Sequence, residues 1–381
     1  MFTGRELSLK VAAPGLMALM LAACGSPATP TASVSSPPGA SPSAATSAAT
    51  SPAAKPTPGA ADVRLVIDDI GAGQVRLAKL DATRTAAVTG RFVGIVNDHV
   101  IVVNGTTLET IDRAGTVRKL GQLAADPNLN GSGAVAVNPD LSRWIYTIAD
   151  SAWTTQVHLG TATGDSVVAS VPSPDGNAFY APFAWNAGGI FMSKQATGLG
   201  GAGPFLEYHF SLAKLDLLGH RVTDVSPSCI AYGVLDDGTM LCRKSYTAGA
   251  IEVRSPSGKT NAIQLTIGTA DIDSVFMRLS VSADNRRVMV SRDGARGSVI
   301  SYQMAVADLS GSSAAAFGPL DYVPDTWLPD GRLVADHSCV ISEWGGGPCN
   351  TGLDGTYIFS ADGNSHVLFF KLQSGLVVGY V

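Results

Sequence analysis

The chain has 381 residues, with 26 Lys and Arg against 31 Asp and Glu, and its formal net charge is −5 at pH 7. Lys and Arg form no basic cluster, which argues against a nucleic-acid partner because contacts to phosphate need grouped positive charge. A hydrophobic content of 45% is enough for a large core, but no stretch approaches the 18 apolar residues of a membrane-spanning helix.

The first 23 residues have the features of an export signal. Arg5 and Lys10 precede a weakly apolar run, residues 11–23, which is too short to span a bilayer and ends in small residues. The run closes as Leu21-Ala22-Ala23-Cys24, which resembles the lipobox of bacterial lipoproteins. That resemblance implies cleavage before Cys24 and acylation of this residue, with palmitate as one expected acyl chain. The alternative is an ordinary secretory signal followed by a chance cysteine.

A multiply acylated Cys24 would anchor the protein stably, since each buried CH2 contributes about 0.8 kcal/mol and a single chain holds only marginally. We therefore expect residues 24–61 to place the protein in the cell envelope, on the extracytoplasmic side of the cell membrane. From Gly25 onward this segment is almost wholly Ala, Ser, Thr, Pro and Gly, with Lys55 as its only charge. Such a composition cannot offset the entropy of ordering, so we predict a disordered tether.

Residues 62–381 are a series of short runs rich in Val, Ile, Leu, Tyr and Phe, separated by polar turns. One turn recurs six times at intervals of 42 to 50 residues, at Asn97, Pro139, Asn186, Asp236, Asp284 and Pro329. A second turn recurs seven times between them, at Asp81, Asp112, Ala162, Asp216, Ser255, Asp308 and Asp362. Two alternating hairpin turns in about 45 residues indicate four antiparallel strands, the pattern of a β-propeller blade.

The count of turns predicts an all-β fold with seven four-stranded blades. The first kind of turn is missing from the N-terminal repeat, which begins abruptly at Val63, and the chain ends on an orphan strand pattern over residues 375–381. We predict that this C-terminal strand completes the first blade and closes the ring, so that residues 62–381 form one propeller domain.

Several turns carry the motif x-x-Asp-Gly, at residues 173–176, 328–331 and 360–363. Asp caps its own turn, and Gly accepts a positive φ. These turns resemble those of TolB-like and WD-repeat-like bacterial propellers over about residues 61–381. The resemblance implies the fold and does not choose a function. The Trp-Asp dipeptides of eukaryotic WD repeats are absent, and we expect none of their His-Asp networks.

Four cysteines remain besides Cys24, in two local pairs, as expected in an oxidising compartment. A bridge between Cys339 and Cys349 would close a Gly-rich loop and stabilise the fold by roughly 3 kcal/mol. For Cys229 and Cys242, a tight turn at residues 236–238 would put the two side chains out of register on opposite faces. Either a bulge, or Cys229 bending off the start of its strand, permits this bridge, or both residues are buried thiols.

The predicted strand order separates two faces of the disc. Both kinds of short turn lie on one face, which we call the turn face. Connections between second and third strands, and those between blades, lie on the other, the loop face. The loop face has the long and unusual connections, at about residues 151–153, 193–205, 292–297 and 339–349. Loops on a rigid scaffold usually carry binding residues, and our candidates are Trp153, Tyr208, His209, Arg292, Arg296, Glu343 and Trp344.

Each candidate also has an ordinary structural interpretation. Trp153 and Trp344 fit stacking on a sugar or peptide, but they also fit capping of blade interfaces. Tyr208 and His209, with Glu207 before them, fit either a polar cluster or the alternation of a strand. Metal and cofactor motifs are missing, since the Asp pairs at residues 68–69 and 271–273 do not continue into a calcium loop.

Three functions stay open from the sequence. The leading interpretation is a non-enzymatic binding or scaffolding propeller for an envelope protein, peptide or glycan. The alternative is an envelope hydrolase or lyase acting on glycan or peptide, with acids such as Glu207, Glu343 or Asp336 in a site built from several blades. Asp336 and His337 fit an acid-base or metal pair, or a histidine hydrogen-bonded inside its blade. The third, an assembly accessory similar to TolB, rests on fold analogy alone.

Overall fold

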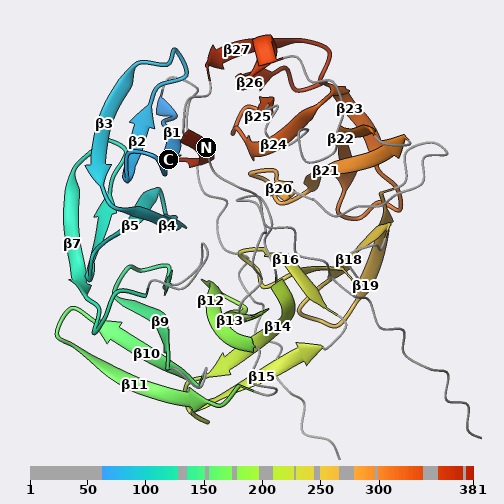
Figure 1. Cartoon of the computed structure of the whole chain (residues 1–381). Coiled ribbons are helices and arrows are strands. Elements are labelled where there is room, and N and C mark those ends of the chain that lie inside the picture. The colour runs from blue at the N-terminus through green and yellow to red at the C-terminus, as the bar shows by residue number, and fades with distance from the viewer. Residues whose placement is uncertain are drawn as a thin grey trace, which may run out of the picture. The chain divides into compact units, whose positions relative to one another are not determined.

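The structure is a computed structural model, which describes residues 62–127, 135–150, 154–173, 178–196, 209–226, 229–243, 249–265, 279–296, 299–337, 351–371 and 375–381. These residues form seven four-stranded antiparallel sheets around a central axis (Figure 1). The fold is therefore the predicted seven-bladed β-propeller. No helix in the described residues has the length and apolar character needed to cross a membrane.

The blades are numbered in chain order, and the strands of each blade follow one another from its inner to its outer edge. Blade 1 consists of β28 (Gly375–Tyr380), β1 (Leu65–Asp69), β2 (Gln74–Ala78) and β3 (Arg84–Thr89). Blade 2 consists of β4 (Arg91–Val96), β5 (His99–Asn104), β6 (Thr107–Ile111) and β7 (Val117–Gln122). Blade 3 consists of β8 (Val135–Val137), β9 (Arg143–Ala149), β10 (Thr155–Thr161) and β11 (Gly164–Val171). Blade 4 consists of β12 (Ala178–Asn186), β13 (Gly189–Ala196), β14 (His209–Asp216) and β15 (Arg221–Ser226).

The second half of the ring repeats this arrangement. Blade 5 consists of β16 (Ile230–Val234), β17 (Met240–Arg243), β18 (Ala250–Arg254) and β19 (Thr260–Gln264). Blade 6 consists of β20 (Leu279–Val281), β21 (Arg287–Arg296), β22 (Val299–Asp308) and β23 (Ala315–Leu320). Blade 7 consists of β24 (Tyr322–Trp327), β25 (Leu333–His337), β26 (Gly355–Phe359) and β27 (His366–Phe370), with a 3-10 turn, η2 (Thr351–Leu353), before β26.

The C-terminal strand closes the ring as the sequence predicts. β28 pairs antiparallel with β1, from Leu65 opposite Tyr380 to Asp69 opposite Gly375. Beyond the ladder, Arg64 and Val381 exchange two main-chain hydrogen bonds of 2.9 Å. The first blade is thus built from both ends of the domain, and its inner edge belongs to the last strand of the chain.

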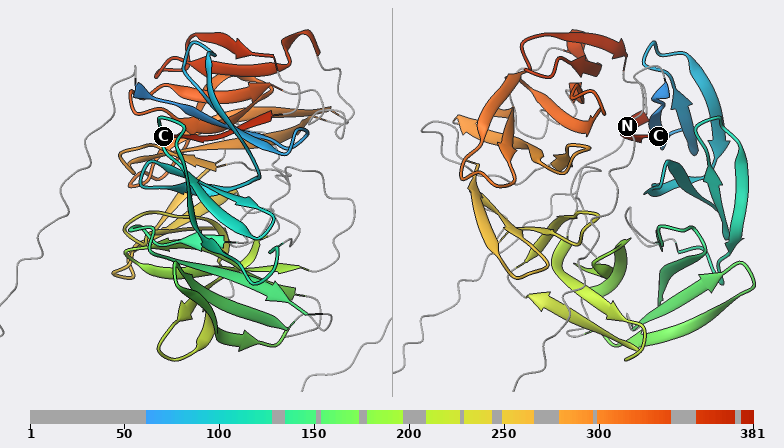
Figure 2. Two further views of the ribbon diagram at one scale, coloured as in Figure 1. Left: turned by 90° about the vertical axis from the view of Figure 1, so that its left-hand side faces the viewer. Right: turned by 180° about the vertical axis from the view of Figure 1, so that it is seen from behind.

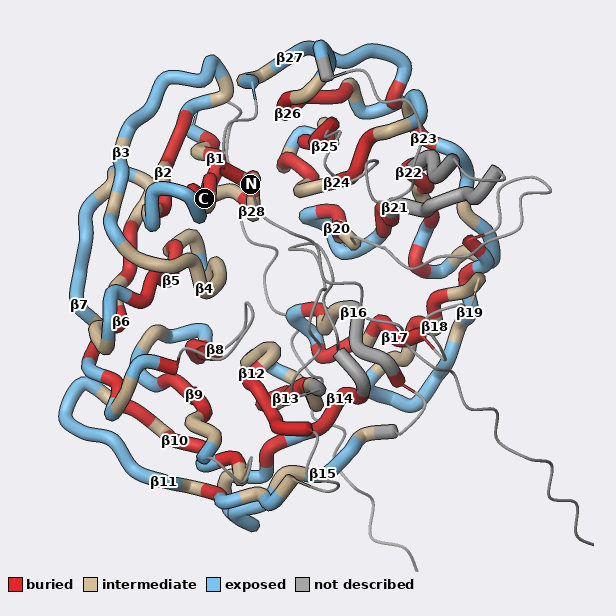
Figure 3. The backbone as a smooth tube through the Cα atoms, in the orientation of Figure 1, coloured by how far each residue is buried: buried red, intermediate tan, exposed pale blue. Residues whose placement is uncertain are grey.

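The core lies between adjacent blades, because alternate side chains of each strand point toward one neighbouring blade or the other. Val66 and Val75 of blade 1 pack with Val100 and Val102 of blade 2 in one such layer. The outer strands are mostly exposed, whereas the second and third strands of the blades are largely buried (Figure 3). The hydrophobic effect therefore holds neighbouring blades together around the whole ring.

Aspartates stabilise the short turns on the turn face. A side-chain oxygen accepts a hydrogen bond of 2.8 to 3.2 Å from the main-chain N–H two residues later, at Asp81, Asp140, Asp216, Asp237, Asp284, Asp330 and Asp362. Glycines with a φ between +74° and +87° complete four of the turns, at Gly238, Gly258, Gly331 and Gly363. This is the turn chemistry that the repeated Asp-Gly motif predicts.

Neighbouring turns also contact one another on the turn face. The Asn186 side chain, in the β12–β13 turn, donates a 2.7 Å hydrogen bond to the Leu235 carbonyl in the β16–β17 turn. Beside it Gly188 approaches Gly238 so closely that a Cβ on Gly188 would lie 2.5 Å from the Gly238 Cα. These contacts link blade 4 to blade 5 through the Asn186 side chain and the main chains of the two turns.

The disulfide between Cys229 and Cys242 is present, with the two Cα atoms 4.8 Å apart and both residues fully buried. The register of β16 against β17 shifts between Ala231 and Gly233, so a bulge brings Cys229 within reach of Cys242. The bulge is one of the alternatives that the sequence leaves open. Cys339 and Cys349 lie outside the described residues.

Candidate functional site

The two faces of the propeller differ in the length of their connections. On the turn face all thirteen connections are described, and each has between two and six residues. On the loop face β25 and β26 are separated by residues 338–354, β19 and β20 by residues 265–278, and β13 and β14 by residues 197–208. The loop face is thus the one with variable connections, as the sequence predicts.

Most of the predicted site residues lie outside the described part of the chain. They are Cys24, Trp153, Glu207, Tyr208, Glu343 and Trp344. His209 is described as the first residue of β14, which fits the strand interpretation of this segment. The candidate binding role of these residues therefore stays a prediction.

Two predicted loops are shorter than expected. β21 continues to Arg296 and pairs with β22 without interruption, from Arg287 opposite Asp308 to Arg296 opposite Val299. The prediction of a loop at residues 292–297 is wrong, since Arg292 and Arg296 belong to a long hairpin whose regular ladder satisfies the main chain. β13 likewise continues to Ala196, so residues 193–196 are strand rather than loop.

Asp336 and His337 are built into blade 7. The Asp336 carboxylate, in a residue only 2% exposed, accepts a 2.5 Å hydrogen bond from the Thr356 hydroxyl. His337 is 3% exposed, and its Nδ1 lies 3.2 Å from an Asp354 oxygen. Its ring packs edge to face against the Tyr322 ring, with the two ring centroids 5.1 Å apart. The hydrogen-bonded histidine is therefore the interpretation that the structure supports.

Charged side chains gather at the loop-face end of blades 1 and 2. Asp69 is buried, forms an ion pair with Arg76 and accepts the Ala72 N–H at 3.0 Å. Burial, and next the Asp69 carboxylate, raise the pKa of Asp68 to about 6, while Arg91 acts in the opposite direction. Sequence reasoning considered the two aspartates only as calcium ligands. Within the described residues no three His, Cys, Asp or Glu side chains are grouped to hold a metal ion.

Arg91 links this charged region to the connection between blades 2 and 3. Its guanidinium lies 3.0 Å from the carboxylate of Asp126, which follows β7. Arg91 and Asp126 are 35 residues apart, so no local motif in the sequence could have predicted the pair. The described part of the loop face thus offers both a half-buried carboxylate and a paired guanidinium to a polar ligand.

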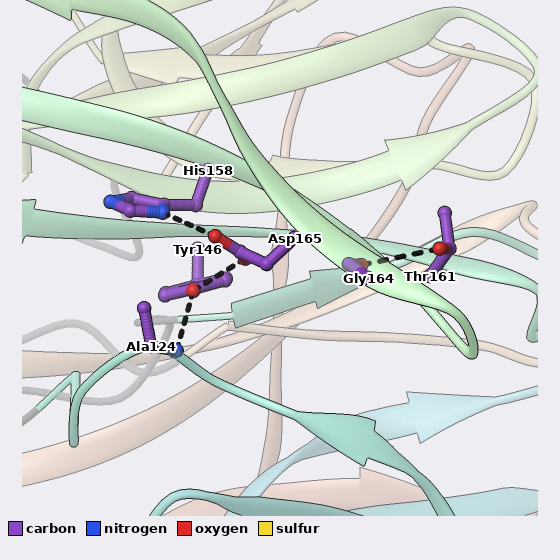
Figure 4. A network of polar contacts seen from close by, with 6 residues as sticks. All are labelled: Ala124, Tyr146, His158, Thr161, Gly164 and Asp165. Atoms are coloured by element: carbon purple, nitrogen blue, oxygen red, sulfur yellow. Dashed lines mark hydrogen bonds and ion pairs between the residues drawn. The ribbon is translucent and has the colours of Figure 1, made fainter.

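A polar network in blade 3 has two buried members, Tyr146 and His158, and an exposed one, Asp165 (Figure 4). Nδ1 of His158 lies 2.8 Å from one oxygen of Asp165, and the Tyr146 hydroxyl donates a 2.5 Å hydrogen bond to the other. The same hydroxyl accepts a 2.7 Å hydrogen bond from the Ala124 N–H. The Tyr146 and His158 rings stack, with their centroids 4.8 Å apart. Burial, and next the hydrogen bond to Asp165, raise the pKa of Tyr146.

This His-Asp interaction was not predicted from the sequence, where only the networks of eukaryotic WD repeats were considered. It differs from a local motif because His158 lies in β10, Asp165 in β11 and Tyr146 in β9, and only strand pairing brings them together. Ala124 belongs to the connection between β7 and β8, so the network ties the entry of blade 3 to its outer strand. All of its contacts lie within blade 3 and the connection that precedes this blade, which fits a structural role.

Comparisons with known proteins find similar solved structures but no family. No protein-family model matches the chain, and no curated protein matches it in sequence. Among solved structures it is similar to TolB from Acinetobacter baumannii, with 13% identity, a TM-score of 0.40 and coverage of 65% of this chain and 61% of that one. It is also similar to an oligogalacturonate lyase in complex with manganese, with 12% identity, a TM-score of 0.46 and coverage of 80% and 83%.

A third similar structure is the β-propeller domain of the Trilobed protease from Pyrococcus furiosus, with 11% identity, a TM-score of 0.46 and coverage of 78% of this chain and 90% of that one. TolB is thus among the propellers that the chain resembles, and the chain spans 61% of the length of the Acinetobacter protein. At these identities and TM-scores the similar structures do not indicate a ligand for this chain.

Proposed function

We propose that the protein is a non-enzymatic binding or scaffolding propeller, anchored by a lipid on Cys24 to the extracytoplasmic side of the cell membrane. In this proposal the loop face binds a protein, peptide or glycan of the cell envelope. The observation that carries it is the asymmetry of the ring. Thirteen turns of two to six residues line one face, whereas the other has connections as long as residues 338–354. A rigid disc with variable loops on one side is suited to recognition.

The cysteines support the proposed compartment. The buried Cys229–Cys242 bridge is a feature of proteins that fold in oxidising surroundings, and the sequence around Cys24 resembles a lipobox. The acyl chains on Cys24 would then hold the domain at the membrane through residues 25–61.

Among the acids of the hydrolase or lyase alternative, the structure describes Asp336 alone. Its carboxylate is buried and bonded to Thr356, so it does not serve as an exposed general acid. One of the three candidate acids of that alternative is thereby removed.

The test compares two variants of the full-length protein in its own cells. Replacing Trp153 and Trp344 together by Ala removes the two aromatic candidates of the loop face. Leu218→Ala is the control, because Leu218 lies on the turn face and is 94% exposed. We expect crosslinking on intact cells, followed by mass spectrometry, to lose the captured partner in the double variant only. Undiminished capture, with an unchanged melting temperature, would reject the two tryptophans as binding residues.

Anchoring is tested separately. Cys24→Ala should move the protein from the membrane fraction to the soluble fraction and remove the mass of the acyl chains from its N-terminal peptide. A membrane-bound Cys24→Ala variant would show that the anchor lies elsewhere.

A further inference from the structure

The two ends of the propeller meet on the turn face. β1 is the second strand of blade 1, so it starts at the turn face and runs to the β1–β2 connection on the loop face. There the Gly90 N–H, between blades 1 and 2, donates a 3.0 Å hydrogen bond to the Gly73 carbonyl. β28 runs antiparallel to β1 and therefore ends where β1 starts.

Close packing against blade 2 places this end independently, since a Cβ on Gly379 would lie 2.4 Å from the Ile95 Cδ1, just before the β4–β5 turn. Burial, and next the carboxylate of Asp98, raise the pKa of Tyr380, the last residue of β28. Asp98 lies in the β4–β5 turn, which belongs to the turn face. Seen edge-on, the C-terminal end lies at one flat side of the disc (Figure 2, left). The paired main chains of Arg64 and Val381 bring the start of the domain to the same place.

The described chain therefore starts at the turn face, and the segment that precedes Asp62 is attached there. If residues 25–61 form the linker that their composition predicts, its root-mean-square length is about 35 Å, from 5–6 Å times the square root of the residue number. Most strands have five to eight residues, and with their connections they make the disc about 20–25 Å high. Four strands spaced by about 4.8 Å add more than about 15 Å from its axis to its rim.

We propose that the turn face is directed toward the anchoring membrane and that the loop face is directed away from it. A linker attached at the turn face has to cross the radius of the disc and then its height before the loop face meets the bilayer. That path is as long as the root-mean-square length of the linker, or longer. An orientation with the loop face on the bilayer would therefore stretch the linker and lower its conformational entropy. The partner of the loop face consequently lies farther from the anchoring bilayer than the propeller does. This inference rests on the lipid anchor of the proposed function.

The experiment uses full-length lipidated protein in phospholipid vesicles that contain an acceptor dye on the lipid headgroup. A donor dye is attached to a cysteine introduced by Leu218→Cys on the turn face or by Ile70→Cys on the loop face. Both positions are exposed, at 94% and 62%. The unsubstituted protein, treated with the same dye, gives the background labelling of its own cysteines.

We expect energy transfer to the vesicle to be about twofold more efficient from position 218 than from position 70, because the disc height of about 20–25 Å separates them. Deleting residues 30–55 should widen the difference, since a short linker restricts the disc further. Equal transfer from both positions in protein that floats with the vesicles, or stronger transfer from position 70, overturns the orientation. Protein that carries no lipid and does not float overturns the anchor instead.

Discussion

The main chains of Arg64 and Val381 are joined by two hydrogen bonds of 2.9 Å, although the residues lie at opposite ends of the folded chain. Each residue donates its N–H to the carbonyl of the other. This pair continues the β1–β28 ladder and makes blade 1 dependent on both ends of the domain. Since the ring has no other closure within the described residues, its stability depends on this last strand.

Deletion of residues 376–381 should lower the melting temperature of the whole domain. Val377 and Val381 are 1% and 0% exposed, and burying a valine contributes roughly 1.5–3 kcal/mol, so the two side chains alone account for about 3–6 kcal/mol. Circular dichroism during heating measures the change. Deletion of six residues within 40–50, in the predicted tether, is the matched control and should leave the melt unchanged. An unaltered melt for the C-terminal deletion would contradict the role assigned to β28.

Gly188→Ala should destabilise the domain by about 1–3 kcal/mol, the usual cost of forcing extra atoms into a packed site. The new Cβ would lie 2.5 Å from the Gly238 Cα, and that backbone cannot move away without disturbing blade 5. Gly94→Ala is the control because nothing lies within 4 Å of its Cβ position. Urea unfolding of both variants gives the comparison. Similar unfolding midpoints would show that the turns with Gly188 and Gly238 are not in tight contact.

The turn aspartates should make the fold sensitive to acid. Hydrogen bonds from Thr83 to Asp81 and from Ser142 to Asp140 lower the pKa of these carboxyls, and the N–H groups of Gly219 and Leu218 do the same for Asp216. A lowered pKa in the folded state contributes stability above the unfolded pKa of about 4, and this contribution is lost as the pH falls through the folded value.

The melting temperature should therefore decrease below about pH 4, the unfolded pKa of an aspartate. Asp81→Asn combined with Asp140→Asn keeps an oxygen that accepts the turn hydrogen bonds but removes two titrating groups. This variant should lose less stability than the parent between pH 5 and pH 2, measured by thermal melts at fixed salt. A parallel decrease in both proteins would argue against the turn carboxylates as the cause.

Asp68 should make stability change with pH in the opposite direction to the turn aspartates. Its pKa is raised to about 6 by burial and by Asp69, so the folded state binds a proton more tightly than the unfolded state between about pH 4 and pH 6. Stability is lost as the pH rises through this interval, because the folded domain has to hold the charge. Asp68→Asn should therefore gain melting temperature relative to the parent at pH 7–8 and little at pH 4. Thermal melts across this range test it, and a loss at pH 7 would indicate that the ionised carboxylate is stabilising.

The fold could be predicted because its signal is local and repeated. Each Asp or Asn turn has its own hydrogen bonds within a few residues, as at Asp362, and the spacing of such turns reports the strand order directly. Strand extension is different, since the ladder from Arg292 to Arg296 contains Asp293 and Gly294, residues typical of turns. There the regular pairing with β22 outweighs the local preference.

Contacts that depend on register could not be predicted from spacing. The Cys229–Cys242 bridge needs a bulge near Tyr232, and a one-residue shift in a strand reverses the direction of its side chains. The pairing of His158 with Asp165 depends on how β10 and β11 align. In both cases the decisive interaction is between strands, and the sequence of either strand alone does not contain it.

The position of β28 also sets the order of events when the protein is made. A ribosome produces β1, β2 and β3 first and β28 last, so blade 1 stays without its inner strand until the whole domain has been synthesised. The other six blades are each contiguous in the chain, so all four strands of each are available as soon as that blade has been synthesised. The first blade to be translated is thus the last to be completed, and ring closure follows synthesis of the final residues.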